Sequence, residues 1–321
     1  MENTNRFHHV WVAGAGTMGH GLALLMAKAG CEVSLSDPSD RAMKTALELV
    51  KSHLAVLVED GQVGRESISA ILGRIHPVKP THPMDSADLI LETISEDVDA
   101  KRAFLADVAS RCRPDSVVAS NTSYLNVFDL APANLQERLL ICHFFAPPYI
   151  IPLVEIVKGP GTTPHLVQRM REFLLAIGHT PVLVEKYIPG FIVNRLQRAL
   201  GREIFHLIDQ GYAQPEQIDK AVLASLGIRI PVLGVVKRYD FAGLDFTAKV
   251  LSNPSIGLAS TDRPSTAVTR LVDKGHNGVK SGKGFYDYTD QNPSDIYRQR
   301  DRLLLKMRRV IAEIEKSFWQ G

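Results

Sequence analysis

One glycine-rich turn constrains this chain more than any other feature of its sequence. Residues 7–13 (FHHVWVA) are β-branched and aromatic, which predicts a strand, and residues 17–29 carry apolar side chains at helical spacing. Between them lies the turn GAGTMG, with glycines at 14, 16 and 19. In such a strand–turn–helix unit the first glycine permits the tight turn, and the second lets the backbone approach a pyrophosphate. The third lets the helix pack closely on the strand. The sequence therefore predicts a dinucleotide held at the helix N-terminus by Gly14, Gly16, Thr17, Met18 and Gly19.

An acidic residue, Asp37, closes the strand predicted over residues 32–36. A carboxylate at this place can accept hydrogen bonds from both ribose hydroxyls and would repel the 2′-phosphate of NADP, so we expect NAD. Arg41 lies one helical turn further on and leaves room for NADP. The alternative is a glycine turn in an α/β protein that binds no nucleotide, with Asp37 acting as a helix N-cap.

Strands and helices alternate over the first part of the chain. Helical periodicity covers 41–58, 98–111 and 164–177, and further strand candidates lie at 87–92, 116–120, 139–144, 153–157 and 181–184. This alternation implies an α/β fold with a parallel sheet covered on both faces. Beyond Tyr187-Ile188-Pro189-Gly190 the pattern changes to long helical stretches at 191–211, 215–226 and 296–318. We therefore predict two domains, 1–188 and 189–321, the second of them all-α.

The composition excludes several classes of function. Apolar residues make up 45% and charged residues 22%, which is typical of a globular protein, and the net charge is +2. So small a charge argues against nucleic acid or an anionic membrane as a partner. The longest apolar stretch is interrupted by a histidine, three prolines and a glutamate, and we see no signal peptide. We expect a cytoplasmic protein without a metal site, since its cysteines lack metal-ligand spacing (Cys31, Cys112, Cys142).

His143 ends an apolar strand, and Glu155 follows twelve residues later inside the next strand (LVEIV). A histidine with a pKa near neutrality can take a proton from an alcohol while hydride leaves the same carbon. A carboxylate on its second nitrogen would fix the tautomer and stabilise the imidazolium. The alternative is a hydrogen-bonded core histidine, with Glu155 pointing to solvent.

Polar residues 120–123 (SNTS) follow the strand predicted over 116–120, at the edge of the sheet where ligands bind. The side chains of Asn121 and Ser123 can hydrogen-bond a nicotinamide amide or a substrate oxygen. Capping and turn formation are the alternative, since Ser, Asn and Thr do this routinely.

Five motifs in order, GAGTMGHG, SNTS, HFF-x-P with LVEIV, PGFIVNRL and KSGKGFYDY, resemble the 3-hydroxyacyl-CoA dehydrogenase family from residue 8 to about residue 288. The resemblance implies a Rossmann-like doubly wound sheet followed by a helical domain that contributes to a homodimer. It further implies that Glu96, Lys101 and Lys280 contact NAD together with the glycine turn, Asp37 and Asn121. Ser123 would contact the reacting oxygen, His143 would be the base with Glu155 as its partner, and Asn194 would be an active-site amide.

The chain departs from this family at two places. The family reads HFFNP where this chain has Ala146, and a lost hydrogen bond near the nicotinamide costs about 1–3 kcal/mol. We therefore expect altered specificity or rate. The helix over residues 41–58 is followed by Glu59 and Asp60 where acyl-CoA members carry a basic cluster. Acidic side chains there would repel the phosphates of CoA.

Leu226-Gly227-Ile228-Arg229, together with residues 146–152, resembles branches that act on small free acids, such as gulonate and carnitine dehydrogenases. A pyridine-carboxylate dehydrogenase looks similar over residues 227–245. In these branches the guanidinium of Arg229 suits a substrate carboxylate. The alternative is that Arg229 caps a helix or pairs with a surface acid.

These observations predict an NAD-dependent dehydrogenase that interconverts a secondary 3-hydroxyl group and a ketone. The substrate would be a 3-hydroxyacyl-CoA, which would place the protein in fatty acid metabolism. The alternative is a small free hydroxy acid or a pyridine carboxylate. A third interpretation is a non-catalytic NAD-binding protein, which the combined His143, Glu155 and Asn194 disfavour.

Overall fold

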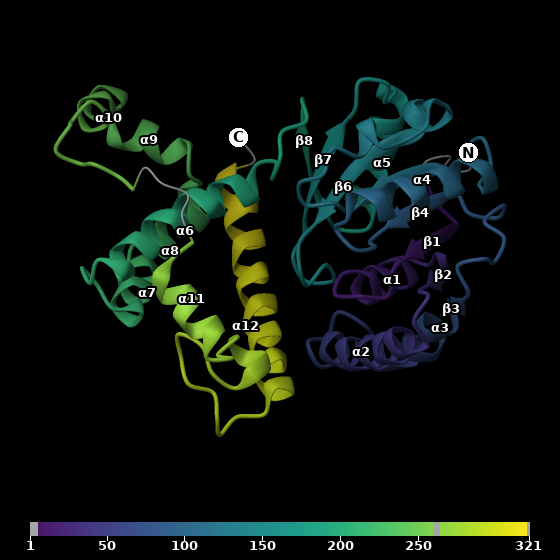
Figure 1. The fold of residues 1–321 in the computed structure, drawn as a ribbon, viewed down its shortest axis with the longest axis horizontal. Coiled ribbons are helices and arrows are strands. Elements are labelled where there is room, and N and C mark those ends of the chain that lie inside the picture. The colour runs from purple at the N-terminus through teal and green to yellow at the C-terminus, as the bar shows by residue number, and fades with distance from the viewer. Residues whose placement is uncertain (1–5, 260–263, 320–321) are drawn as a thin grey trace. The chain divides into compact units, whose positions relative to one another are not determined.

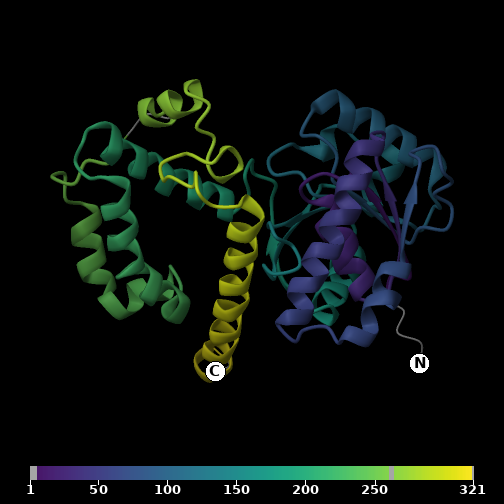
Figure 2. The ribbon, with the colours of Figure 1, turned by 90° about the horizontal axis from the view of Figure 1, so that it is seen from below.

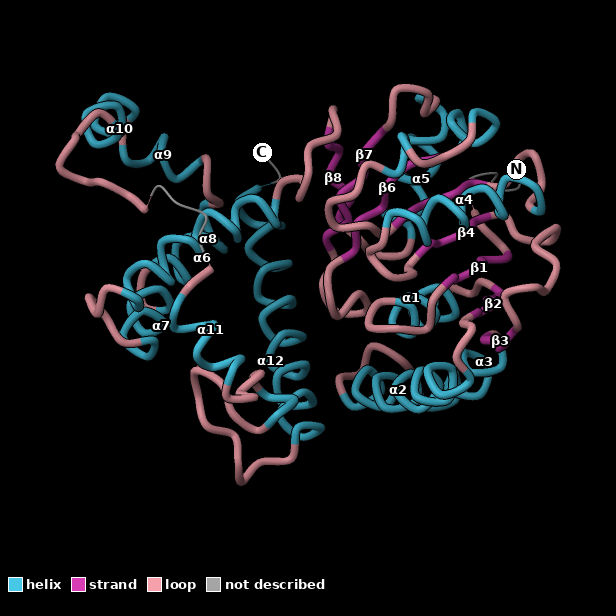
Figure 3. Tube along the Cα trace, in the orientation of Figure 1, coloured by secondary structure: helices cyan, strands magenta, loops and turns pink. Residues whose placement is uncertain are grey.

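The computed structural model describes residues 6–259 and 264–319 of the chain. By its internal contacts the chain divides into two units, Met1–Arg195 and Leu196–Gly321. Figure 3 shows the strands gathered in the first unit and helices in the second. The expectation of an α/β sheet domain followed by an all-α domain is thus confirmed. The boundary at residue 188 remains a prediction.

Within the described residues, the first unit contains one eight-stranded sheet in the order β3-β2-β1-β4-β5-β6-β7-β8. The strands are β1 (His9–Ala13), β2 (Glu32–Ser36), β3 (Ile75–Val78), β4 (Leu89–Glu92), β5 (Val117–Ser120), β6 (Leu139–Phe144), β7 (Leu153–Lys158) and β8 (Thr180–Val184). The order reverses direction between β1 and β4, because the chain first builds outward from β1 to β3 and then returns to β1's other side. This is the doubly wound topology, and ligands bind at such a reversal.

Helices cover both faces of this sheet: α1 (Gly19–Lys28), α2 (Asp40–Glu59), α3 (Ile68–Gly73), α4 (Val98–Arg111) and α5 (Pro164–Ala176). Side chains alternate along β1, so that Trp11 joins a core cluster that includes Leu105 and Val108 of α4. Helix α1 packs on β1 and β2 and contacts α2. Figure 1 shows α1 and α4 on opposite sides of the central strands.

The structure corrects the expected sheet at two places. The expected parallel sheet has one exception, because β6 and β7 pair antiparallel. Only residues 145–152 connect them, which is too short for the crossover that a parallel pair needs. Strand β3 was not predicted, since its sequence IHPV contains Pro77. Proline is tolerated at a sheet edge, and β3 is the edge strand next to β2.

The second unit is built from helices: α6 (Val193–Asp209, which begins in the first unit), α7 (Pro215–Leu223), α8 (Leu226–Leu233), α9 (Lys237–Ala242), α10 (Leu244–Leu251), α11 (Thr266–Asp273) and α12 (Pro293–Ile314). The helix predicted over 215–226 is shorter, because α7 ends at Leu223 and α8 starts three residues later. Figures 1 and 2 show α12 as one long straight helix, as the 296–318 periodicity predicted apart from its ends.

Candidate active site

The glycine turn has the geometry that its sequence predicts. A Cβ added to Gly14, which has a φ of +96°, would lie 2.6 Å from the carbonyl oxygen of Thr93, and one on Gly19 would lie 1.7 Å from the carbonyl oxygen of Gly14. A Cβ on Gly16 would meet no atom within 4 Å. Gly14 and Gly19 therefore let the turn and helix pack closely, whereas Gly16 keeps an open surface for a ligand.

A cavity of about 490 Å³ opens beside this turn. It is lined by Ala15, Gly16, Thr17, His20, Ser39, Arg41, Ala42, Thr45 and Leu49. Met18 occupies the N-cap position of α1 and makes no side-chain capping bond, so the first backbone N–H groups of the helix remain available to an anion. The open Gly16 and the uncapped helix fit the pyrophosphate of NAD.

The carboxylate of Asp37 is fixed at the end of β2. Its Oδ2 accepts a hydrogen bond from the backbone N–H of Ala15 at 2.9 Å, and its Oδ1 accepts one from that of Ser39 at 2.8 Å. The alternative that Asp37 is the helix cap is wrong, because Ser39 caps α2 by accepting from the N–H of Ala42. Asp37 instead joins the turn to β2, at the position where a ribose would be recognised.

His143 and Glu155 lie directly opposite each other in the antiparallel pair β6–β7. The Nδ1 of His143 is 2.9 Å from Oε2 of Glu155, and Glu155 is fully buried. The alternative in which Glu155 faces solvent is therefore wrong. Because an ionised carboxylate has no proton to give, the neutral imidazole donates from Nδ1 and keeps its lone pair on Nε2.

The second oxygen of Glu155 holds the start of α6. Its Oε1 accepts hydrogen bonds from the backbone N–H groups of Ile192 and Val193, each at 2.9 Å. These are N–H groups that a helix leaves without partners, and the helix N-terminus favours the negative charge. Asn194 follows in the first turn of α6. One carboxylate thus orients the histidine and anchors the helix that carries the predicted active-site amide.

The loop after β5 is tied to β6 and to the segment that follows β4. The Oδ1 of Asn121 accepts a hydrogen bond from the backbone N–H of Phe144, the residue after His143, at 2.8 Å. The backbone N–H of Ser123 donates to Oε1 of Glu96 at 2.7 Å, while the Ser123 hydroxyl makes no hydrogen bond to the described part of the chain. That hydroxyl is therefore available to a ligand. Its contact with substrate and the cofactor contact of Asn121 remain predictions.

Glu96 and Lys101 belong to an ion network that also contains Glu92; Glu92 and Lys101 are buried, and Glu96 is partly exposed. Lys101 Nζ lies 2.6 Å from Glu92 Oε1 and 3.1 Å from Glu96 Oε2. Burial opposes ionisation of Glu96, but hydrogen bonds from Thr122 and Ser123 and the charge of Lys101 outweigh it and hold the pKa of Glu96 below its ordinary value. Lys101 is only 1% exposed, so its ammonium is engaged by the two carboxylates.

The remaining predicted site residues lie in the second unit. Arg229 lies on α8 and Lys280 in a short 3-10 helix over Val279–Ser281, and both side chains are exposed. Their roles toward substrate and cofactor remain predictions.

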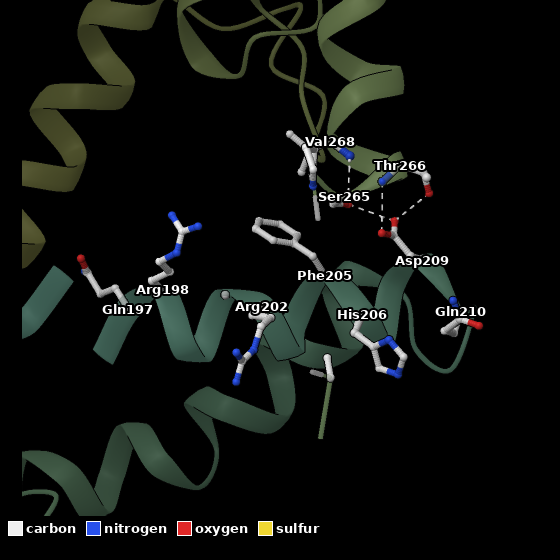
Figure 4. Close-up of a pocket in the computed structure, with 13 residues that line it drawn as sticks. Gln197, Arg198, Arg202, Phe205, His206, Asp209, Gln210, Ser265, Thr266 and Val268 are labelled. Carbon is white, nitrogen blue, oxygen red and sulfur yellow. Dashed lines mark hydrogen bonds between the residues drawn. The ribbon is translucent and has the colours of Figure 1, made fainter. Parts of the chain in front are cut away.

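A second cavity, of about 730 Å³, runs along α6 within the helical unit. Figure 4 shows Asp209 at one end of it, where its carboxylate accepts hydrogen bonds from Ser265 and Thr266. Gln197, Arg198, Arg202, Phe205 and His206 come from α6, and Val268 comes from α11. Asp209 thereby fixes the start of α11 to α6.

Two side chains near the predicted residues were missed at the sequence level. Phe191 has a left-handed backbone (φ 50°), and its ring centroid lies 5.3 Å from that of His143. Glu92 ends a strand whose other residues are all apolar, and that buried acid was the available signal. Among the residues that the structure describes, no group of three acidic, cysteine or histidine side chains could hold a metal ion. No described helix is long and apolar enough to cross a membrane.

The doubly wound sheet and the open glycine turn define an α/β domain of the dinucleotide-binding class, and the hydrogen-bonded His143 and Glu155 lie in the same domain. Sequence comparison then identifies the family. The NAD binding domain of 3-hydroxyacyl-CoA dehydrogenase matches residues 9–187, and the C-terminal domain of the same enzyme matches residues 190–288. The chain belongs to the 3-hydroxyacyl-CoA dehydrogenase family and is an NAD-dependent oxidoreductase that acts on a CH–OH group.

Similar proteins come from two branches of this family. A 5-formyl-3-hydroxy-2-methylpyridine 4-carboxylate 5-dehydrogenase of Mesorhizobium japonicum is 30% identical over 94% of this chain and 98% of its own length. A probable 3-hydroxybutyryl-CoA dehydrogenase of Bacillus subtilis is 31% identical over 88% of this chain and 98% of its own length. A crystal structure of the pyridine-carboxylate enzyme, described as an NAD⁺-dependent dismutase, superposes with a TM-score of 0.85 at 30% identity over 96% of this chain and 99% of that one. The crystal structure of the (S)-3-hydroxybutyryl-CoA dehydrogenase of Ralstonia eutropha superposes with a TM-score of 0.69 at 27% identity. The match covers 88% of this chain and 99% of that one.

Proposed function

We propose that this chain interconverts a 3-hydroxyacyl group and the corresponding ketone, with His143 as the general base and acid. The observation that carries the proposal is the 2.9 Å hydrogen bond from His143 Nδ1 to the buried Glu155. It leaves Nε2 as the atom that takes the hydroxyl proton as the alcohol is oxidised. NAD, when bound, supplies the hydride acceptor. Glu155 stabilises the imidazolium that results, while its own charge is balanced by two backbone N–H groups at the start of α6.

The other predicted residues complete this assignment. Ser123 offers a hydroxyl to the reacting oxygen, and Asn194 offers an amide from the first turn of α6. The cofactor is held by the glycine turn and Asp37.

A second candidate substrate is a small free carboxylic acid that is not carried on CoA. Helix α2 ends in Glu59 without a basic side chain in its last turn, and Asp60 follows. These charges disfavour an approach of CoA phosphates along this helix. The similarity to the pyridine-carboxylate dehydrogenase over nearly the whole of both chains supports the same alternative. Arg229 is then the candidate partner of the substrate carboxylate.

One assay separates these substrates: oxidation of NADH by the purified protein with acetoacetyl-CoA, run beside acetoacetate at the same concentration. Turnover of the thioester supports the acyl-CoA assignment. Turnover of acetoacetate alone moves the assignment to the free acid. NADH binding without turnover of these or of ring-carboxylate substrates contradicts the proposed reaction and favours a non-catalytic NAD-binding protein.

We also propose that the chain forms a homodimer in the cytoplasm. Large apolar side chains on α10 and in the segment before α9 are strongly exposed: Val236 is 76%, Leu244 63% and Leu251 77% exposed. Apolar surface of this extent is typical of an interaction site, and closed dimers are the commonest assembly. We propose a role of this protein in fatty acid metabolism only if its substrate is an acyl-CoA. The assay with acetoacetyl-CoA and acetoacetate therefore tests that role as well.

A further inference from the structure

We propose that Glu92, which no motif singled out, is a positioning residue for the reaction and that Lys101 acts with it. Together they hold residues 120–123, which are the end of β5 and the loop that follows it, in the conformation that presents Ser123. This inference rests on the proposed role of Ser123 in binding the reacting oxygen. It gives Lys101 a different role from the cofactor contact that the family resemblance implies.

Glu92 is connected to both ends of this segment, directly at Ser120 and through Lys101 and Glu96 at Ser123. Oε2 of Glu92 accepts a hydrogen bond from the hydroxyl of Ser120, the last residue of β5, and Oε1 accepts from Lys101. Lys101 also contacts Glu96, which accepts from the backbone N–H of Ser123 at the other end of the segment. One buried lysine therefore links the two carboxylates that fasten the two ends.

The environment shows why these charges hold the loop firmly. Glu92 is 0% and Lys101 1% exposed, so neither charge can exchange its partners for water without opening the core. Glu92 is held in turn by the backbone N–H of Ile94, at 2.9 Å from its Oε1. Each charge in the network thus has a defined partner, and removal of Lys101 leaves the buried Glu92 without a positively charged partner.

The place of the network in the fold points to a role in the site. Glu92 ends β4 and Ser120 ends β5, and the two are register partners in neighbouring parallel strands. The carboxyl ends of such strands are where ligands bind in doubly wound sheets. Apolar side chains of the same volume would fill a purely structural position at a smaller desolvation cost. A three-charge network that fastens this loop and includes Lys101 of α4 is suited to orienting polar groups for a ligand.

Two variants test the proposal from opposite sides: Glu92→Gln removes the charge but keeps the shape, and Ser120→Ala removes only the link to the loop. We expect amide hydrogen exchange in peptides covering 120–125 to rise at least about tenfold in both, with exchange elsewhere unchanged. We expect kcat to fall about 10- to 100-fold, because misplacing a reacting contact is that costly. Glu185→Gln, which breaks the exposed Lys158–Glu185 pair, is the matched control and should change neither quantity.

A double-mutant cycle with Ser123→Ala completes the test. If Glu92 acts through Ser123, the double variant is no slower than the slower single variant, whereas additive losses or unchanged exchange in the loop would overturn the inference. The proposed function fails differently: Ser123→Ala would then leave kcat unchanged while Glu92→Gln still increases exchange at Ser123. Because Ser120→Ala leaves the ion pairs intact, a folding failure of Glu92→Gln does not remove the exchange test.

Discussion

His143 and Glu155 are register partners in β6 and β7, and their side chains meet at 2.9 Å between Nδ1 and Oε2. The histidine is thus aimed by a strand pair, not by a flexible loop, which favours a fixed orientation of its free lone pair on Nε2. This arrangement leads to the first prediction.

His143→Gln should lower kcat about 10²- to 10⁴-fold, because a general base contributes that much to proton transfer. The dissociation constant for NADH should stay within about twofold, since the residues at the glycine turn are untouched. Steady-state kinetics and fluorescence titration of NADH give the two values. His165→Gln, an exposed histidine of α5, is the control. Weakened NADH binding by His143→Gln would argue against a purely catalytic role.

Glu155→Gln should impair both the reaction and the start of α6. An amide cannot accept on both sides, so either the Nδ1–H of His143 or the N–H groups of Ile192 and Val193 meet a donor. We expect kcat to fall about 10²- to 10⁴-fold, and the free energy of unfolding to fall by about 1–3 kcal/mol. Denaturant unfolding measures the change in the free energy of unfolding, and steady-state kinetics measure the change in kcat. A loss of stability without loss of kcat would restrict Glu155 to a structural role.

The glycines of the turn should respond differently to substitution by alanine. Gly16→Ala should fold normally, since its Cβ meets no protein atom within 4 Å, yet raise the dissociation constant for NADH at least about tenfold, or about 1.4 kcal/mol. Gly19→Ala should instead lower the free energy of unfolding by about 1–3 kcal/mol or more, because its Cβ would meet the carbonyl of Gly14. Thermal unfolding and NADH titration separate the two effects. An unchanged dissociation constant for NADH in Gly16→Ala would contradict the assignment of the pyrophosphate to this turn.

Asp88 should make stability depend on acidity. Burial opposes its ionisation, but hydrogen bonds from the backbone N–H groups of His8 and His9 and from Arg113 outweigh that effect and lower its pKa below the ordinary 3.8. A lowered pKa in the folded state contributes stability that is present above the unfolded value and is lost as pH falls through the folded value. Asp88→Asn should therefore cost about 1–3 kcal/mol at pH 7 and less as pH falls below 3.8. Urea unfolding of the wild-type protein and of Asp88→Asn, from pH 7 to below pH 3.8, measures the difference in their free energies of unfolding. A difference that increases as the pH falls would contradict the prediction.

The exposed apolar side chains of α10 should matter for assembly. Leu244→Ser and Leu251→Ser, combined, should raise the dissociation constant of the dimer at least about tenfold, because each apolar side chain buried in an interface contributes about 1.5–3 kcal/mol. Sedimentation velocity over a concentration series measures it. Leu175→Ser on α5, half exposed in the first unit, is the control. A wild-type chain that sediments as a monomer would refute the homodimer.

The cofactor turn and most strands and helices of the sheet domain could be read from the sequence, because they depend on local rules. Strand β6 covers the predicted residues 139–144, where an apolar run has clear ends. Gly14 and Gly19 are recognisable because only glycine fits where a Cβ would strike backbone. The pairing of His143 with Glu155 was proposed from the sequence, but only strand register placed the two side chains face to face.

The other contacts between separate elements were decided by the tertiary structure alone. The direction of β7 follows from a connection too short for a crossover, and β3 is tolerated with Pro77 because it lies at the sheet edge. Glu155 became a helix anchor, and Lys101 a buried partner of Glu92, only when separate elements came together. A sequence specifies local conformation through spacing and residue type, whereas the cost of burying a charge depends on which partners the completed fold supplies.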